Sequence, residues 1–222
     1  MSKKIGLLCM TTGMLLIMCA LSLLIYNTVG DSIAGNDAQE VLSALNVIIA
    51  DNKANIASNQ GNEAEVALET IDNLGEDADE GSSDENSLHE MPTVTINGVE
   101  YIGVISLPKY GIELPVQASW SEEGLKTGPG RYSGTLDEGN LIIAGHNYRT
   151  HFGNLTSTKV GETIIFTDIY GNEYTYTVSE VVIIDGNDSA SMLAGSDGWD
   201  LTLFTCTLSR TTRVTVRCVL VD

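Results

Sequence analysis

The sequence predicts a mainly β domain, a mostly antiparallel closed barrel with only short helices, behind an N-terminal region of different character. From Pro92 onward, short apolar runs alternate with Gly, Pro, Asn and Asp, which is typical of barrels and sandwiches. Residues 75–90 are rich in Ser, Asp and Glu, as in a solvated linker. Before the linker, a run without charged residues is followed by apolar residues at helical spacing. We therefore expect a barrel at 91–222 that follows a separate extension.

The extension begins with a segment that has the properties of a membrane-spanning helix. Lys3 and Lys4 precede a run without charge from Ile5 to Ile25, which as a helix spans about 31 Å at about 1.5 Å per residue. Lysines before the run and acids after it place the N-terminus in the cytoplasm. We predict a cytoplasmic tail at 1–4, a single transmembrane helix at 5–26 and an extracellular remainder. A cleaved signal peptide is the alternative, although no Ala-x-Ala site follows the run.

Residues 27–90 are predicted to form a helical stalk and the acidic linker. A helix is expected from Asp37 to Leu74, with a break at Asn59–Asn62. Its first part carries an apolar stripe at helical spacing, formed by Val41, Leu42, Leu45, Ile48 and Ile49. An alternative role for this helix is to cover part of the domain that follows.

The charge of the chain excludes one class of partner. The formal net charge is −19, from 11 Lys and Arg against 30 Asp and Glu. Nucleic-acid binding needs a basic footprint, so we expect no nucleic acid as a partner. Surface solubility is the simpler explanation of the acidity.

The barrel region contains seven candidate strands. These are 101–106, 112–116, 140–146, 163–168, 173–184, 201–205 and 213–221. Gly171-Asn172 is typical of a hairpin turn, and Pro108 and Pro115 are expected at strand edges. Only short helical pieces are expected, for instance around 121–125 and 189–193.

Three residues at or near strand ends suggest an active site. The strand Leu201–Thr205 delivers Cys206, Arg213 opens the next strand, and the apolar strand ending at Gly145 is followed by His146. A thiol nucleophile, an imidazole that carries protons and a fixed cation together indicate a thiol enzyme.

The C-terminal hairpin argues against a disulfide between Cys206 and Cys218. If Cys206 and Arg213 flank the turn, Cys218 lies about 16 Å farther down the return strand. A disulfide needs Cα atoms within about 7 Å, so we expect Cys206 to be a free thiol.

These residues favour acyl transfer through a thioester. The imidazole of His146 can take the thiol proton or deliver one to a leaving amine. The guanidinium of Arg213 can stabilise the oxyanion that forms when an amide carbonyl is attacked. Two further candidates for binding substrate are the hydroxyl of Thr205 and the side chain of Asn147, which follows His146 in the sequence.

Each residue also has a structural explanation. Cys206 can be buried filler, His146 a turn residue and Arg213 a solvated strand residue. Arg210 is a rival for the role of the cation, and His151 for that of the histidine. A metal site from His146, His151 and nearby acids has no recognised ligand spacing, so no metal and no cofactor are expected.

The quoted segments resemble the sortase family, the membrane-anchored cysteine transpeptidases of Gram-positive cell envelopes. The resemblance rests on Leu201–Cys206, Arg213–Val216 and Ala144–Asn147, and extends over about 101–221. Three more segments share it, namely Ile102–Val116 with its two strands, Gly124–Gly130, and Phe152–Leu155 with Gly161-Glu162.

The resemblance implies an eight-stranded barrel with His146, Cys206 and Arg213 as the catalytic trio. It also implies cleavage of a Leu-Pro-x-Thr-Gly-type sorting signal, a thioacyl intermediate on Cys206, and transfer to an amine of a peptidoglycan precursor or a pilin. Surface proteins with that signal would be the partners, at the outer face of the membrane. Part of the stretch Val181–Leu193 is expected to line an apolar groove for the signal.

Some family features are absent or open. No Asp-Pro-aromatic lid motif precedes the barrel, which argues against a pilin-polymerising subclass. Calcium modulation, which occurs in some sortases, is left open by the residues. A cysteine L,D-transpeptidase would carry a Ser-x-Gly-Cys motif, and Thr205-Cys206 lacks the glycine. A non-enzymatic binding or adhesion module on a membrane stalk is the alternative from a different class.

Overall fold

The computed structural model describes residues 2–66, 91–193, 198–207, 209 and 211–221. The acidic linker predicted at 75–90, the predicted end of the stalk helix at Leu74 and the rival cation Arg210 lie outside the described residues.

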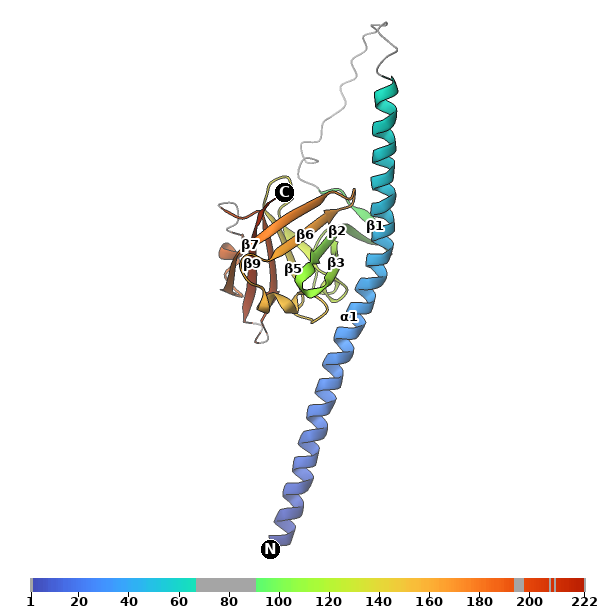
Figure 1. The fold of residues 1–222 in the computed structure, drawn as a ribbon. Helices are drawn as coiled ribbons and strands as arrows, with labels where there is room; N and C mark the ends of the chain where they lie inside the picture. Colours follow the sequence, from blue (N-terminus) through green and yellow to red (C-terminus); the bar gives the residue numbers. More distant parts are fainter. Residues whose placement is uncertain (1, 67–90, 194–197, 208, 210, 222) are drawn as a thin grey trace.

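The described chain consists of one long helix, nine strands and several short helical turns (Figure 1). The strands are β1 (Val94–Ile96), β2 (Val99–Leu107), β3 (Ile112–Gln117), β4 (Gly130–Ser133), β5 (Leu141–Gly145), β6 (Thr163–Asp168), β7 (Glu173–Asp185), β8 (Leu201–Cys206) and β9 (Thr212–Leu220). The helical elements are α1 (Ser2–Val66), η2 (Pro108–Tyr110), η3 (Gly124–Lys126), η4 (Phe152–Ser157) and α2 (Ser189–Leu193).

Eight of the strands close into a barrel, as expected. The strand order is β1-β2-β3-β4-β5-β8-β9-β7-β6, and β2 also pairs with β6, so only β1 lies outside the closed ring. Most pairs are antiparallel, but β3–β4 and β5–β8 are parallel. The β3–β4 pair is a single residue pair, Gln117 with Gly130. Pro115 is therefore tolerated in β3, because most of that strand edge needs no ladder donor.

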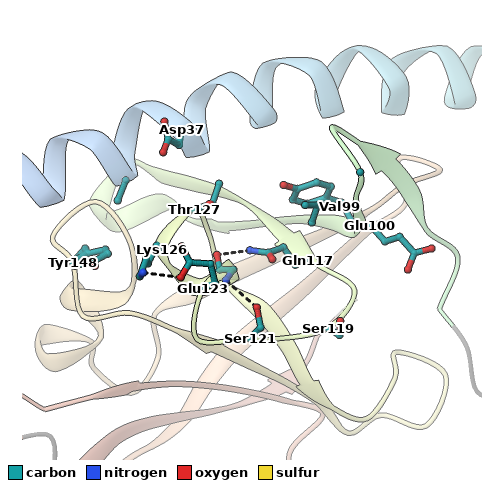
Figure 2. Close-up of a pocket in the computed structure, with 14 residues that line it drawn as sticks. Asp37, Val99, Glu100, Gln117, Ser119, Ser121, Glu123, Lys126, Thr127 and Tyr148 are labelled. Carbon is teal, nitrogen blue, oxygen red and sulfur yellow. Dashed lines mark hydrogen bonds and ion pairs between the residues drawn. The ribbon is translucent and has the colours of Figure 1, made fainter.

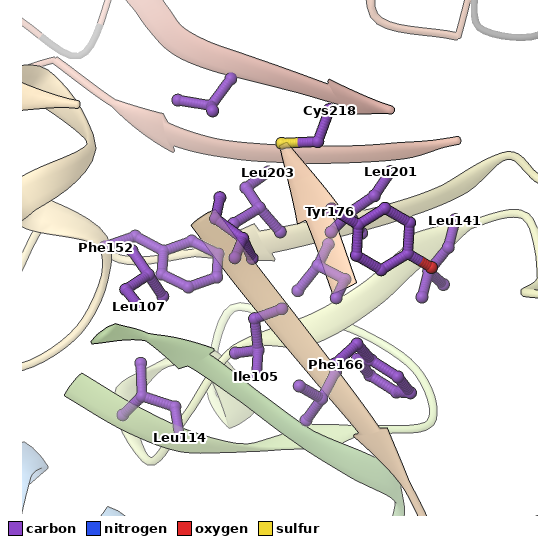
Figure 3. Packing of buried hydrophobic residues seen from close by; sticks show 14 of the residues in the cluster. Ile105, Leu107, Leu114, Leu141, Phe152, Phe166, Tyr176, Leu201, Leu203 and Cys218 are labelled. Atoms are coloured by element: carbon purple, nitrogen blue, oxygen red, sulfur yellow. The ribbon is translucent and has the colours of Figure 1, made fainter. Parts of the chain in front are cut away.

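The barrel interior is filled by alternate residues of the strands (Figure 3). Leu201 and Leu203 of β8 are fully buried in the main core. Val216 and Cys218 of β9 are fully buried in the same core. Phe152 joins the same core from η4. Because side chains alternate along a strand, Phe204 and Cys206 of β8 point to the outer face of the sheet.

All seven predicted strands are present, within two residues at each end, and two short strands were missed. The predicted helical piece at 189–193 is confirmed as α2, whereas the piece at 121–125 is shifted to η3. The hairpin turn predicted at Gly171-Asn172 is confirmed and connects β6 to β7. Gly171 adopts a φ of 83°, and the Asp168 N–H donates to the Asn172 carbonyl. The missed strands β1 and β4 have three and four residues, too few for an alternating pattern to be visible.

The N-terminal helix differs from the prediction in continuity. The break expected at Asn59–Asn62 is wrong, because α1 continues to Val66. No Pro or double Gly interrupts this stretch, and the single Gly61 is tolerated in a helix.

The middle of α1 packs on the barrel, as in the alternative role considered for it (Figure 1). The predicted apolar stripe is the contact: Val41, Leu42, Leu45 and Ile49 are buried with Tyr101 and Val104 of β2. Farther along, the Asn52 side-chain amide donates to the Ile169 carbonyl, 2.9 Å away. The packed part of α1 thus runs from Ala34 to about Lys53, which lies against Gly171.

The transmembrane helix predicted at 5–26 is not supported by the structure. The segment is helical, as part of α1, but among the described residues no helix combines the length and hydropathy that crossing a bilayer requires.

Candidate active site

The parallel pairing of β5 and β8 brings two distant strand ends together. The register aligns Ala144 with Phe204 and Gly145 with Thr205. The next residues along the two strands are His146 and Cys206. Since parallel strands end at the same edge of a sheet, the histidine and the cysteine emerge side by side.

The antiparallel β8–β9 pair places the arginine on the other side of the cysteine. Cys206 and Arg213 are directly opposite each other in the register. Neighbouring strands lie about 4.8 Å apart, so the three residues form a row across β5, β8 and β9 with Cys206 in the middle. Cys206 is exposed, and His146 and Arg213 are partly buried.

All three residues belong to the outer face of the barrel. Side chains alternate between the two faces of a strand, so Cys206 lies on the same face as Phe204, two positions earlier. Arg213 lies on the face opposite to that of its neighbour Val214, which points into the main core. His146 follows Ile142 and Ala144 at even spacing and therefore lies on their face. The residues of this face form a second apolar group, here called the outer-face cluster. It consists of Leu125, Ile142, Ala144, Ile184, Met192 and Phe204, with Tyr132 and Val182 packed against it.

The guanidinium of Arg213 is held by two contacts. Its Nη1 donates a hydrogen bond to the carbonyl oxygen of Gly186, in the turn after β7. Its Cζ also lies 5.6 Å from the ring centroid of Phe204, a cation–π distance. These contacts fix a permanent positive charge beside the Cys206 position.

Of the two further binding candidates, Asn147 directly follows His146 and is partly buried. Thr205 is fully buried, and its alternation with Cys206 directs its side chain to the barrel interior. Its hydroxyl oxygen has no hydrogen-bond partner among the described residues. The structure therefore does not bring the Thr205 hydroxyl to the row formed by His146, Cys206 and Arg213.

The thiols of Cys206 and Cys218 are both free, as expected. In the strand register, Cys206 lies opposite Arg213, whereas Cys218 lies opposite Leu201 at the other end of β8. Cys218 is fully buried, and this burial raises the pKa of its thiol to about 12. Such a thiol stays protonated and unreactive at neutral pH.

The rival histidine His151 is placed away from the row. Its side chain is fully buried, and its Nε2 lies 3.4 Å from the carbonyl oxygen of Ala34 on α1. The ring of Tyr148 contacts both histidines, with its centroid 5.1 Å from that of the His146 ring and 5.4 Å from that of the His151 ring. Within the described ranges, no group of three or more His, Cys, Asp or Glu side chains is placed to hold a metal ion.

A cavity of about 760 Å³ lies between α1 and the barrel (Figure 2), and Cys206 is not among its lining residues. Its lining includes Asp37 of α1, Glu100 of β2 and Tyr148. The Gln117 side-chain amide donates to the carbonyl of Gly124, and Lys126 forms an ion pair with Glu123, so the wall opposite α1 is internally bonded. His146, Cys206 and Arg213 are not among the lining residues, but the cavity reaches Tyr148, whose ring lies beside that of His146.

Sequence reasoning missed Phe204, Gly186 and Tyr148 as neighbours of the trio. Phe204 has a readable signal, because it shares the strand face of Cys206 two positions earlier. The carbonyl of Gly186 and the ring of Tyr148 are brought in by loops whose course depends on the closed barrel, so no local pattern reveals them.

Comparisons with known proteins agree with the fold and the motifs. A family model described as the sortase domain matches residues 105–221. Sortase A of Bacillus anthracis is 30% identical over 133 residues, covering 58% of this chain and 62% of that protein. Sortase D of Bacillus subtilis is 26% identical over 107 residues, covering 47% of this chain and 53% of that protein. The chain thus spans less than two thirds of the length of both curated relatives.

Solved structures show the same likeness. Sortase C1 of Streptococcus agalactiae is 29% identical with a TM-score of 0.50, covering 58% of this chain and 71% of that chain. Sortase C1 of Streptococcus suis is 27% identical with a TM-score of 0.50, covering 62% of this chain and 76% of that chain.

Proposed function

Because this chain belongs to the sortase family, whose domain model matches more than half of it, we propose that it is a cysteine transpeptidase. Its substrates are surface proteins that carry a Leu-Pro-x-Thr-Gly-type sorting signal, and its acceptor is an amine of a peptidoglycan precursor or a pilin. The reaction takes place in the cell envelope and needs no cofactor. The observation that supports the proposal best is the row of His146, Cys206 and Arg213 set by strand register.

The first half-reaction forms a thioester. His146 accepts the proton of the Cys206 thiol, and the thiolate attacks the carbonyl carbon of the signal threonine. The negative charge that develops on the carbonyl oxygen is stabilised by Arg213, which is already fixed by Phe204 and Gly186. When the C–N bond to glycine breaks, His146 returns its proton to the leaving amine.

The second half-reaction releases the product. The acceptor amine loses a proton to His146 and attacks the thioester carbon, and the C–S bond breaks. The product is a new amide, and Cys206 recovers the proton from His146. At the end of the cycle, Cys206 and His146 are back in their starting protonation states, and no group has been oxidised or reduced. The reaction therefore needs no redox cofactor.

The outer-face cluster is the proposed binding surface for the leucine and proline of the signal. It is apolar, it shares its face of the sheet with Cys206, and it includes residues of β5, β8 and β7. Val182 and Ile184 lie within the stretch predicted to line the groove. Leu125 of η3 and Met192 of α2 pack with the strand residues in this cluster.

The direct test compares variants of the full chain on a Leu-Pro-x-Thr-Gly peptide with and without added amines. Cys206→Ala is expected to reduce both cleavage and amine transfer to background, because no other side chain takes over the acyl group. His146→Ala is expected to reduce both steps as well.

Cys19→Ala is the matched control, since Cys19 is exposed on α1 and precedes the part of the helix that packs on the barrel. It is expected to retain full activity. If Cys206→Ala retains activity while its thermal unfolding matches that of the unmodified chain, the thiol enzyme is excluded and the binding module is favoured.

A further inference from the structure

The loop that carries His146 is pressed against the long helix α1. His146 follows the last residue of β5, and five residues later His151 is fully buried. The carbonyl oxygen of Ala34, 3.4 Å from His151 Nε2, can only accept a hydrogen bond, so Nε2 carries the hydrogen and donates it. This bond orients the buried ring.

The segment between the two histidines is compact. The N–H groups of His151 and Gly153 both donate to the carbonyl of Tyr148, at 3.0 and 2.9 Å, and the Phe152 N–H donates to the carbonyl of His146, 3.1 Å away. The Tyr148 ring contacts both the His146 ring and the His151 ring, in tilted and edge-on arrangements. Aromatic pairs at such distances prefer definite orientations, so the three rings constrain one another.

A second contact joins the same loop to α1. Gly35 lies so close to Thr150 that a Cβ added to it would be 2.9 Å from Thr150 Cγ2. Ala34 is itself buried. The helix thus meets the loop at two consecutive residues, and both contacts need α1 in its docked position.

We propose that His151 is a positioning residue that transmits the docking of α1 through Tyr148 to His146. The inference rests on the proposed function, in which His146 exchanges a proton with Cys206. His146 lies beyond the end of its strand, so the β ladder alone does not fix its ring. A displacement of about 1 Å at a proton-transfer group lowers the turnover rate by about 100-fold. Loss of the contact between α1 and the His146 loop is expected to lower kcat by up to about this factor.

The proposal is tested with full-chain variants on each side of the contact. His151→Ala removes the ring and the hydrogen bond, and His151→Gln keeps a side-chain N–H donor. Gly35→Ala acts from the helix, because its methyl group meets Thr150. Gly13→Ala is the matched control, since the same substitution on the same helix meets nothing within 4 Å.

Two measurements are made on each variant. The first is kcat and KM for the sorting peptide. The second is the rate of iodoacetamide alkylation of Cys206 against pH, followed by peptide mass spectrometry, with His146→Ala as the reference for a lost imidazole. The proposal predicts that His151→Ala and Gly35→Ala lower kcat by about 10- to 100-fold with KM changed less than about twofold. Both variants should shift the alkylation profile toward that of His146→Ala, whereas His151→Gln recovers part of kcat and Gly13→Ala changes neither.

The opposite result overturns the proposal: folded His151→Ala and Gly35→Ala chains with kcat and alkylation profile equal to those of the unmodified chain. If His151→Ala does not fold, Gly35→Ala decides alone. If the unmodified chain cleaves no sorting peptide, the proposed function fails, and the alkylation profiles still show whether α1 controls His146.

Discussion

At the scale of single residues, two thiols on paired strands have opposite environments. Cys206 ends β8 in solvent, whereas Cys218 points into the main core. Only the thiolate reacts with alkylating agents, and the pKa of about 12 keeps Cys218 protonated.

We therefore predict that iodoacetamide at pH 8 modifies Cys206 in the folded chain and leaves Cys218 unmodified. Peptide mass spectrometry after a short reaction measures both sites. Addition of denaturant exposes Cys218 and is expected to abolish the difference. Equal labelling of the two residues in the folded chain would contradict the burial of Cys218.

A substitution of Arg213 can show whether the planar shape of the guanidinium, and not only its positive charge, contributes to kcat. Its guanidinium donates to Gly186 while it lies against the Phe204 ring, and a lysine ammonium does not reproduce this planar contact. We predict that Arg213→Lys lowers kcat for the sorting peptide by about 100-fold, the cost of one lost oxyanion donor.

The matched control for that substitution is Arg149→Lys, at an exposed arginine. It is expected to leave kcat unchanged. Steady-state kinetics on both variants decide the matter, and equal kcat values for the two would show that Arg213 acts only as a distant charge.

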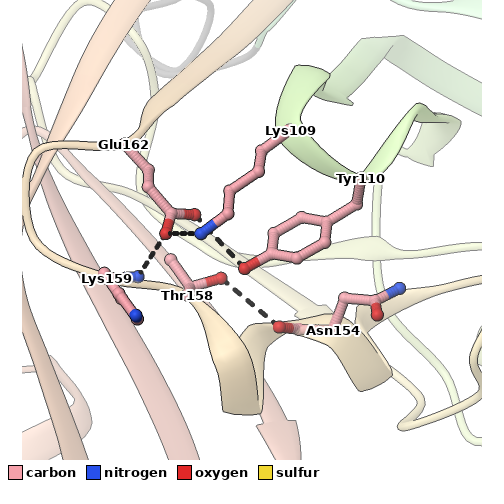
Figure 4. Close-up of polar contacts among 6 residues, drawn as sticks. All are labelled: Lys109, Tyr110, Asn154, Thr158, Lys159 and Glu162. Atoms are coloured by element: carbon pink, nitrogen blue, oxygen red, sulfur yellow. Dashed lines mark hydrogen bonds and ion pairs between the residues drawn. The ribbon is translucent and has the colours of Figure 1, made fainter.

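At the scale of elements, a polar network joins η2 to the start of β6 (Figure 4). Glu162 accepts hydrogen bonds from the Lys109 ammonium, from the Tyr110 hydroxyl at 3.2 Å and from the Lys159 N–H at 2.9 Å. Burial alone would raise the pKa of Glu162, but these donors, led by Lys109, hold the pKa below its ordinary value. The ionised carboxylate is therefore favoured in the folded chain.

This network predicts a pH-dependent stability. Since the folded pKa is lower than the unfolded value of about 4.3, the contribution is complete above that value and is lost as the pH falls through the folded pKa. Glu162→Gln should lower Tm at pH 7, and the difference from the unmodified chain should shrink between about pH 5 and pH 3. Thermal unfolding across this range checks the prediction. Glu173→Gln, at an exposed position, serves as the control, and a difference that stays constant with pH would exclude the network.

The elements also show what could be predicted from sequence. Long alternating strands such as β7 and β9 were predicted because one face of each is buried, which leaves a period of two in the residues. The parallel pairing of β5 with β8 was not predicted, because it joins strands that are far apart in sequence. That pairing explains why His146 and Cys206 lie side by side. The sequence identified these two residues as candidates, but not the reason for their proximity.

At the scale of the whole molecule, α1 is part of the folded domain and not only a stalk. Periodicity identified the apolar face of this helix, but no local pattern specifies that its partner is β2. The helix reaches from the His146 loop at Ala34 to the β6–β7 turn at Gly171, so it spans one side of the barrel.

The docking of α1 predicts a large effect of one core substitution. Leu45 is fully buried between α1 and β2. Leu45→Ala is expected to cost about 2–5 kcal/mol of the interaction that holds the helix, seen as faster amide hydrogen exchange across Ala34–Lys53. Val47→Ala is the control on the same helix, because Val47 is 61% exposed. Equal exchange in the two variants would show that the helix does not dock in solution.

The most direct test of the central claim is intact-protein mass spectrometry of the full chain mixed with a sorting peptide in the absence of any amine. We predict a mass increase equal to the acyl part of the peptide up to its threonine, mapped to Cys206 and removed by hydroxylamine. An adduct on another residue, or peptide cleavage that persists in a folded Cys206→Ala chain, would contradict the account.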